Sequence, residues 1–511
     1  MKPSSKPGRA GLTERLAAAS ARRPKRTLLL WGIAVVAALV LTGTTLQGLT
    51  TSEHVVGSTP SSQGEAIYRQ VIGATAANRR PTDVIVVSSK SATVDDADFQ
   101  RLVTRLIAQV RTSPGVTSVG TDLGPGSPLV SSTGHAAMID LRAGSDADIK
   151  PVVEAVRSAN GTGGFAVAVT GTHTVANDFT TLSTSDLHRG ELDFGLPIAL
   201  VILILVFGAV VAGLMPVAIA LISIIVGLGI ASIVSQEFSL SIFVLNMMIG
   251  MGLALGIDYS LFVVSRFREE RGNGLDKEAA VRRTGATASR AVLFSGSTFV
   301  VALCAMFLVR TNVLRSLAAG AIIVGIVSVV AALTLLPAIL SLMGDRINAL
   351  RVPFVGKNLG RADASEAKTW RAMIDKVTRR PAISLALAGG FMVLAAAPIL
   401  GLHIGQSGVA TLPDTLPSKQ GYLALQANFP NQHPNPVEIV AVAGTATAHA
   451  DADLAALDTT LTDDPRFGRG TIQVSSNGKL LALTVPIRGD AVSSQDVAAV
   501  SDLRQHLIPS A

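Results

Sequence analysis

The sequence is poor in cysteine, and its histidines do not cluster. The single cysteine, Cys304, lies in an apolar run, which excludes an intramolecular disulfide and a C-x-x-C metal or redox motif. His135, His173 and His188 are too scattered along the chain to indicate a metal site. We find no nucleophile and base set, phosphate-binding loop or metal-ligand spacing. We therefore expect neither an enzyme nor a protein that holds a metal or another cofactor.

Charged residues are also scarce. They make up 15% of the 511 residues, against about 25% in globular proteins, while 49% of the residues are hydrophobic and the mean hydropathy is +0.47. This composition is typical of a polytopic membrane protein. The net charge of +7 is also a feature of nucleic-acid-binding proteins. Here, however, Lys and Arg gather in three segments that flank apolar runs, as in cytoplasmic loops of membrane proteins. We expect no nucleic acid partner.

Seven apolar segments are long enough to cross a bilayer, which takes about 20 helical residues. The run from Phe194 to Gln236 has no charge and is too long for one helix, so we expect a hairpin that turns between Gly213 and Pro216. A cleaved signal peptide is the alternative for the first segment, but its length and the lack of an A-x-A site favour an uncleaved helix. The predicted helices are 27–48, about 194–213, 216–235, 240–266, 290–309, 314–343 and 382–401.

Two stretches between these helices have the composition of soluble domains. Residues 49–190 contain short strands and amphipathic helices in the order β-α-β-β-α-β, the ferredoxin-like arrangement, and we expect them to fold autonomously. Residues 403–511 repeat this order as far as β-α-β-β-α, so we expect the second copy to be incomplete. One helix followed by one such domain, twice in a chain, is an internal repeat.

The predicted fold is therefore a polytopic α-helical membrane protein with about seven transmembrane helices and extracytoplasmic α+β ferredoxin-like domains. Its segments, in chain order, are a disordered basic cytoplasmic tail (1–26), transmembrane helix one (27–48), the first extracytoplasmic domain (49–190), transmembrane helices two to six (191–343), a basic cytoplasmic linker (344–380), transmembrane helix seven (381–402) and the second, incomplete extracytoplasmic domain (403–511).

One carboxylate lies inside an apolar run, at Asp258 in the stretch Ile249–Arg271. No other charge occurs from Phe238 onward until Arg266, eight positions further, so Asp258 lies roughly 12 Å inside the span at ~1.5 Å per residue. An ionised aspartate at this depth costs a few kcal/mol, and such residues usually face a bundle interior and mark proton or ion pathways. We therefore predict a buried functional carboxylate. The alternative is a residue that only ties helices together by hydrogen bonds.

The neighbourhood of Asp258 favours the functional interpretation. Gly252 and Gly256 form a G-x-x-x-G pair, which lets another helix approach closely, and Tyr259 supplies a hydroxyl beside the acid. The fifth span opens with RAVLFSGSTF, at a level comparable to Asp258. Three hydroxyls of this segment are candidates to donate a hydrogen bond to the carboxylate: Ser295, Ser297 and Thr298.

These residues carry a family resemblance. GIDYSLFVVSRFREE, FSGST and the order of one helix, a ferredoxin-like domain and five helices resemble the N-terminal half of an MMPL transporter of the RND superfamily, over about 27–511. In that family two such halves face each other, and an Asp-Tyr pair from each forms a proton relay for the export of lipids or other hydrophobic molecules. The resemblance implies that Asp258, Tyr259 and Ser295 belong to a relay and that the soluble domains are porter domains. Helices eight to twelve of the family pattern are absent from this sequence.

The leading interpretation is thus export of lipids or other hydrophobic molecules driven by the proton-motive force, in the inner (cytoplasmic) membrane. Its partners would be protons, membrane lipids and the hydrophobic substrate, together with a missing C-terminal half or another copy in a homo-oligomer. Two alternatives stay open. Helices two to six also resemble a sterol-sensing domain, which fits a lipid-sensing or accessory membrane protein, and a truncated remnant would not pump.

Overall fold

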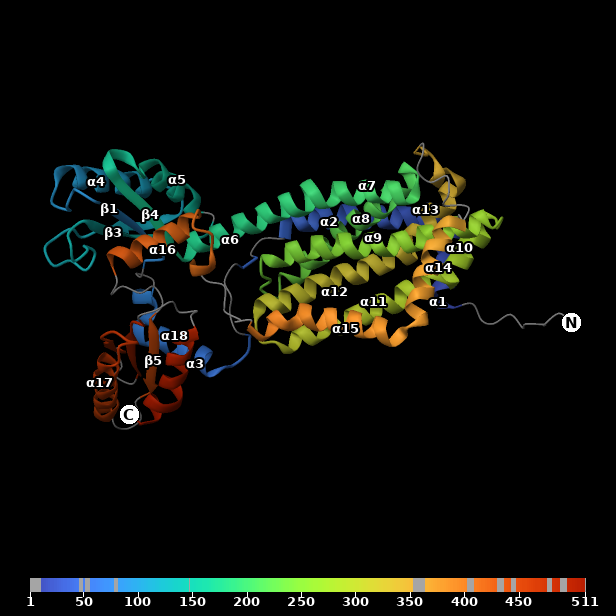
Figure 1. Cartoon of the computed structure of the whole chain (residues 1–511). Coiled ribbons are helices and arrows are strands. Elements are labelled where there is room, and N and C mark those ends of the chain that lie inside the picture. Colours follow the sequence, from blue (N-terminus) through green and yellow to red (C-terminus); the bar gives the residue numbers. More distant parts are fainter. Residues whose placement is uncertain are drawn as a thin grey trace. The chain divides into compact units, whose positions relative to one another are not determined.

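The computed structural model describes residues 11–45, 49–50, 56–77, 81–146, 148–352, 364–401, 409–429, 436–442, 447–475, 480–487 and 494–510. The chain forms two compact units. One comprises Met1–Val56 and Leu182–Gly401, and the other comprises Gly57–Thr181 and Leu402–Ala511. The first unit is a block of helices, and the second contains two β-sheets with their helices (Figure 1).

Among the described residues, seven helical segments are long and apolar enough to cross a membrane. They are formed by α2, by α6 with α7, by α8, by α9, by α10 with α11, by α12 with α13, and by α15. This confirms the predicted polytopic fold. The helices of the spans are α2 (Pro24–Thr45), α6 (Thr172–Asp186), α7 (Leu196–Phe207), α8 (Val210–Val234), α9 (Phe243–Gly272), α10 (Lys277–Ala286), α11 (Ala288–Cys304), α12 (Asn312–Leu333), α13 (Leu335–Met343) and α15 (Pro381–Ala396). Two further helices, α1 (Leu12–Arg22) and α14 (Ala364–Arg379), are not part of a span.

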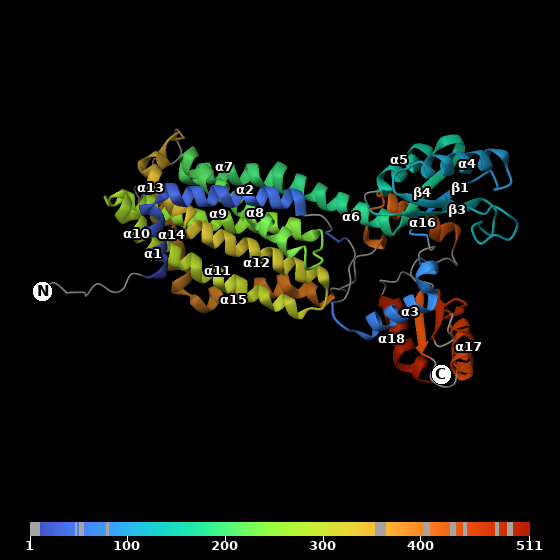
Figure 2. The ribbon, with the colours of Figure 1, turned by 180° about the vertical axis from the view of Figure 1, so that it is seen from behind.

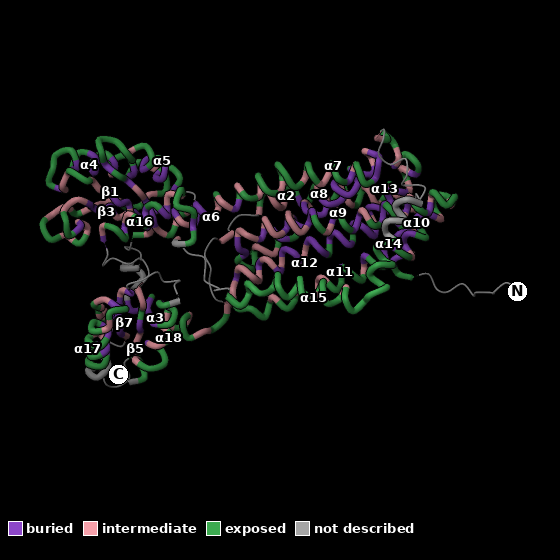
Figure 3. Tube along the Cα trace, viewed as in Figure 1, coloured by how far each residue is buried: buried purple, intermediate pink, exposed green. Residues whose placement is uncertain are grey.

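The core of the block lies where α8, α9 and α12 pack together, and most of the buried positions of the spanning helices are found there (Figure 3). Helix α2 lies along α8 (Figure 2), where a Cβ on Gly229 would come 2.5 Å from the Cβ of Ala38. The Trp31 indole of α2 donates a hydrogen bond to the Thr334 hydroxyl at the junction of α12 and α13, over 3.1 Å. Helices α11 and α15 are largely exposed.

The hairpin of α7 and α8 turns at a different glycine from the one we predicted. Gly208 ends α7 with φ 61°, a left-handed conformation that glycine adopts at low cost, whereas Pro216 lies inside α8. Gly213 serves close packing instead, because a Cβ there would lie 2.8 Å from the backbone nitrogen of Ile204. The predicted turn between Gly213 and Pro216 is therefore wrong.

The N-terminal segment 1–26 is not disordered where the structure describes it. Helix α1 packs its small side chains against α10, and a Cβ on Gly285 would lie 2.8 Å from the Cβ of Ala17, which is fully buried. Arg282 of α10 pairs with Glu14 over 3.3 Å. Exposed pairs of this kind contribute little, so the packing of small residues accounts for the docked helix. We predicted disorder from the basic charge of this segment and did not recognise that its small residues form a packing face.

The first sheet has the order β2-β3-β1-β4 with antiparallel neighbours throughout. It confirms the predicted β-α-β-β-α-β order, with α4 and α5 sharing one apolar core with the sheet. The second sheet has the order β5-β7-β6, also antiparallel, and confirms β-α-β-β-α. Their elements are β1 (Asp83–Ser89), α4 (Ala97–Arg111), β2 (Val116–Gly120), β3 (Ala136–Ala143), α5 (Ile149–Ala159), β4 (Phe165–Gly171), β5 (Val437–Val442), α17 (Thr447–Asp463), β6 (Thr471–Val474), β7 (Leu480–Val485), α18 (Ser494–Asp502) and α19 (Ile508–Ser510).

Each sheet is covered on one face by helices of its own segment and on its second face by a helix from the other soluble segment. Helix α16 (Pro417–Asn428), which follows the last span, packs on the first sheet, where Leu425 and Phe429 cluster with Val86 and Met138. These two strand residues point away from the α4 and α5 side because neighbours along a strand alternate between faces. Helix α3 (Pro60–Ala77), which follows the first span, packs on the second sheet in the same manner. The predicted segment 49–190 thus contributes a helix to the second sheet and receives one from 403–511.

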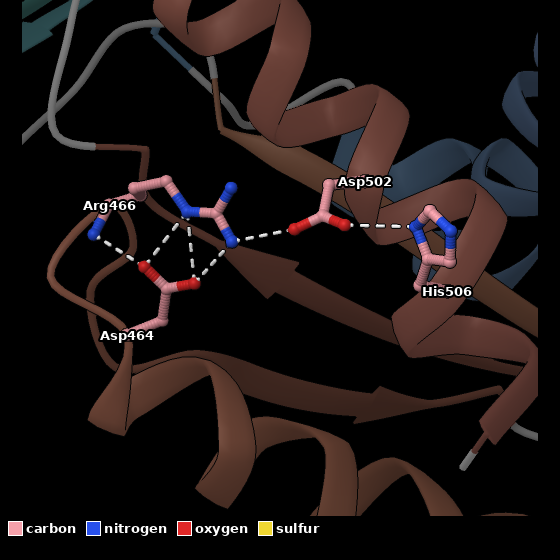
Figure 4. A network of polar contacts seen from close by, with 4 residues as sticks. All are labelled: Asp464, Arg466, Asp502 and His506. Atoms are coloured by element: carbon pink, nitrogen blue, oxygen red, sulfur yellow. Dashed lines mark hydrogen bonds and ion pairs between the residues drawn. The ribbon is translucent and has the colours of Figure 1, made fainter.

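An ionic network ties α18 to the loop before β6 (Figure 4). The Arg466 guanidinium donates to the Asp464 carboxylate over 2.6 Å and to the Asp502 carboxylate over 2.8 Å. The His506 ring contacts the other oxygen of Asp502 over 3.0 Å. Hydrogen bonds from Arg466 hold the pKa of Asp464 below its usual value, and bonds from Arg466 and then His506 do the same for the pKa of Asp502. Both carboxylates therefore stay ionised at neutral pH.

Candidate functional site

Helix α9 carries four of the five predicted site residues. Two of these residues, Gly252 and Gly256, lie against α8. A Cβ on Gly256 would lie 2.6 Å from the Cα of Ala220, and one on Gly252 would overlap the Ile224 side chain. No side chain fits at either position. The glycines therefore let α8 and α9 approach almost backbone to backbone, which is the packing that a G-x-x-x-G pair permits in membranes.

Tyr259 is packed inside the block, with 7% of its surface exposed. Its hydroxyl lies beside α11, where a Cβ on Gly296 would be 3.5 Å from the Tyr259 oxygen and would overlap Val329 of α12. Ser295 is the side-chain hydrogen-bonding neighbour of Tyr259. Gly296 thus makes room for the tyrosine, a role that we did not predict. The only signal in the sequence was a small residue within FSGST.

Asp258 is exposed in this chain, in contrast to the buried carboxylate that we expected. It shares the outer side of α9 and α11 with apolar side chains that are themselves exposed, Phe262 by 52% and Phe294 by 62%. We call the surface formed by Asp258, Phe262 and Phe294 the open face. Among the described residues, Asp258 has no ion-pair or hydrogen-bond partner in the structure.

The hydroxyls of α11 do not reach Asp258 in the predicted manner. Ser297 donates to the backbone oxygen of Leu293 over 2.8 Å, and Thr298 donates to that of Phe294 over 2.9 Å, so both satisfy their own helix. Ser295 interacts with Tyr259 instead. The chain therefore brings a carboxyl and a serine hydroxyl to either side of a buried phenol: Asp258 and Ser295 are exposed, and Tyr259 between them is buried.

A second carboxylate also lies against α9. A Cβ on Gly250 would be 2.8 Å from Oε1 of Glu191, in the π-helical stretch Leu187–Gly195 that joins α6 to α7. π-Helical bulges are frequent at functional sites. We did not predict this contact, because Glu191 precedes the apolar run and looks like a boundary residue in the sequence.

The groups of this arrangement are of the kinds that can transfer protons. A carboxyl without a fixed cation can take up and release a proton, and neighbouring hydroxyls can pass it on by exchanging hydrogen bonds. Metal binding has no support within the described ranges, where no three His, Cys, Asp or Glu residues are grouped to hold an ion. The seven candidate membrane spans among the described residues define the class as a polytopic membrane protein.

Comparison with known proteins identifies the family. The MMPL family profile matches residues 56–384, and the chain belongs to that family. It is 29% identical to a putative membrane protein of Streptomyces coelicolor over 85% of this chain and 60% of the relative. It is 30% identical to the trehalose monomycolate exporter MmpL3 of Mycobacterium tuberculosis over 57% of this chain and 33% of the relative. It is 30% identical to the mycolic acid-containing lipids exporter MmpL11 of Mycolicibacterium smegmatis over 47% of this chain and 26% of the relative. The matched part of the chain thus spans about a quarter to three fifths of the length of these relatives.

Proposed function

We propose that this protein takes part in the export of a lipid or another hydrophobic molecule across the cytoplasmic membrane, driven by the proton-motive force. Asp258 and Tyr259 act as its proton relay, with Ser295 as the hydrogen-bonding neighbour of the tyrosine. The observation that carries this proposal is an acidic side chain that has no cationic partner among the described residues. It lies about two turns before Arg266, the next charge of its spanning helix, and next to a buried phenol. Family membership and the names of two relatives, both lipid exporters, support a lipid substrate.

The open face constrains how the relay works. Ionisable residues at this depth almost always face a bundle interior or a water-filled cavity, because contact with lipid costs several kcal/mol. We therefore infer that further helices cover the open face in the working protein, supplied by a C-terminal half or by a second copy. These helices would enclose Asp258 and open it to one side of the membrane at a time.

The test is Asp258→Asn, which keeps the size and hydrogen bonding of the side chain and removes its proton. The variant should be expressed and inserted into the membrane as the parent protein is. Inverted vesicles from these cells should nevertheless lose the uptake of a fluorescent trehalose glycolipid that a pH gradient drives. Asp453→Asn, a matched change at an exposed carboxylate of α17, should leave uptake unchanged. Uptake at the parental rate in Asp258→Asn would show that Asp258 does not carry the proton.

A further inference from the structure

Helix α14 has an apolar stripe that the described part of the chain leaves uncovered. All of its side chains from Arg371 onward are exposed, including those of three large apolar residues. Met373 is 58% exposed, Ile374 55% and Val377 46%. At 100° per residue these three positions span about 100° of the helix circumference, which is one face of the helix. Helix α14 differs in this respect from α1, whose small face is packed against α10.

The charges of α14 are arranged around this stripe. Arg371 and Lys376 flank it on either side of the helix, Arg379 lies opposite, and Asp375 is the one acidic residue between Arg371 and the helix end. None of the four has an ion-pair partner among the described residues. An apolar stripe bordered by basic side chains is the pattern of a helix that lies in the membrane interface, where long basic side chains reach the headgroups.

The chain also fixes where α14 lies with respect to the bilayer. Its last residue, Arg379, is separated from the spanning helix α15 by Arg380 alone, whose backbone (φ −135°, ψ 66°) breaks the helix before Pro381. The start of α15 is the membrane boundary, because Pro381–Gly401 is apolar and carries the seventh span. Helix α14 therefore ends at the bilayer surface, on the side that the positive-inside rule predicts to be cytoplasmic.

We propose that α14 is an interfacial helix that binds anionic phospholipids. Met373, Ile374 and Val377 enter the boundary between headgroups and acyl chains, while Arg371 and Lys376 bind lipid phosphates. The stripe alone would also fit a protein partner. The flanking basic residues favour anionic headgroups, since the cytoplasmic leaflet carries a negative surface potential that attracts basic segments next to spanning helices. This inference does not depend on the proposed transport.

The experiment uses the whole chain with Cys304→Ser, so that each added cysteine is the only one. Spin labels are attached to Val377→Cys on the stripe and, as a matched control, to Asp375→Cys, about 150° around the helix from the stripe. The protein is placed in vesicles of phosphatidylcholine with or without phosphatidylglycerol, with a nickel chelate on both sides. In the anionic vesicles the label at 377 should collide with oxygen several-fold more than with nickel, and the label at 375 should show the reverse.

The same labels separate the other outcomes. Removing phosphatidylglycerol, or adding Arg371→Gln with Lys376→Gln, should shift the label at 377 toward the nickel reagent. A label at 377 that nickel reaches as readily as at 375 in anionic vesicles would overturn the proposal, because the stripe would then lie in water. Shielding of 377 from both reagents would also overturn it and assign the stripe to a protein contact. Equal depth in both lipids and in the double variant would refute the recognition of anionic headgroups.

Discussion

Asp258 and the pair of Asp464 and Asp502 are carboxylates in opposite situations. In the second soluble segment the Arg466 guanidinium bonds to both partners and lowers the pKa of each. On the open face of α9, the described residues give Asp258 no cation at all. A carboxylate with a fixed guanidinium holds elements together, whereas one without such a partner is free to exchange a proton. Local pairing, rather than residue type, thus distinguishes Asp464 and Asp502 from Asp258.

The largest effect is expected from giving Asp258 the kind of partner that Asp464 has. Ser295→Lys brings an ammonium group next to Tyr259 and toward Asp258, and a nearby cation keeps a carboxylate ionised. Because one pKa unit changes the ratio of the two protonation states tenfold, transport driven by a pH gradient should fall by roughly tenfold or more. Ser295→Met, of similar length without charge, is the control. A loss of the same size with methionine would contradict the electrostatic explanation.

A smaller effect is expected from removing the cation of the network. The pKa values of Asp464 and Asp502 are lowered in the folded protein. Their ionised forms therefore stabilise the folded protein at pH values above about 4, the pKa of an aspartate in the unfolded chain. This contribution is lost as the pH falls through the lowered pKa values. With Arg466→Met, hydrogen exchange of the α18 amides should be faster by a factor of a few at pH 7, and this difference should shrink below about pH 4.

Arg469→Met, at an exposed neighbouring position, serves as the control for loss of charge alone. Exchange rates are compared after correction for the intrinsic pH dependence of amide exchange. A difference between Arg466→Met and the parent protein that stayed constant from pH 7 to pH 3 would mean that the network does not act through these carboxylates.

The smallest effect is expected at the edge of the same network. The His506 side chain is 70% exposed and contacts Asp502 from one helical turn away, where ion pairs are weak and screened by solvent. His506→Gln should therefore change the exchange of the α18 amides by less than about twofold at pH 7. An effect equal to that of Arg466→Met would show that the bond between Arg466 and Asp502 depends on the histidine.

The sequence was sufficient where the signal is local. Apolar length identifies the spans, and short apolar runs between turn-rich segments identify β1 and β3. It was insufficient where two positions look alike locally. Gly208 and Gly213 both interrupt the same apolar run, and only the contact of Gly213 with Ile204 decides which of them forms the turn. The exchange of α3 and α16 between sheets was likewise hidden, because it depends on pairing across the whole chain.

The candidate site was predictable in its members and less so in its surroundings. A carboxylate in a charge-free run, next to a tyrosine and after two spaced glycines, stands out in the sequence. The packing between neighbouring helices decides which side of α9 is buried. Hydropathy does not predict this side, because lipid-facing and buried positions are equally apolar. The exposure of Asp258 and the space that Gly296 leaves for Tyr259 therefore required the structure.

The exchange of α3 and α16 sets an order of events during synthesis. The first sheet is complete early in translation, but the helix that covers Val86 and Met138 is made only after the last span. Helix α3 is likewise made before the second sheet, in which Ala482 packs against Tyr68 and Val71 of the helix. A nascent chain thus carries an uncovered apolar surface while the intervening helices enter the membrane. The first sheet can be covered once α16 is made, whereas α3 waits for strands that follow α16 in the chain. A ribosome that stalls before α16 therefore leaves both Val86 and Met138 without their covering helix.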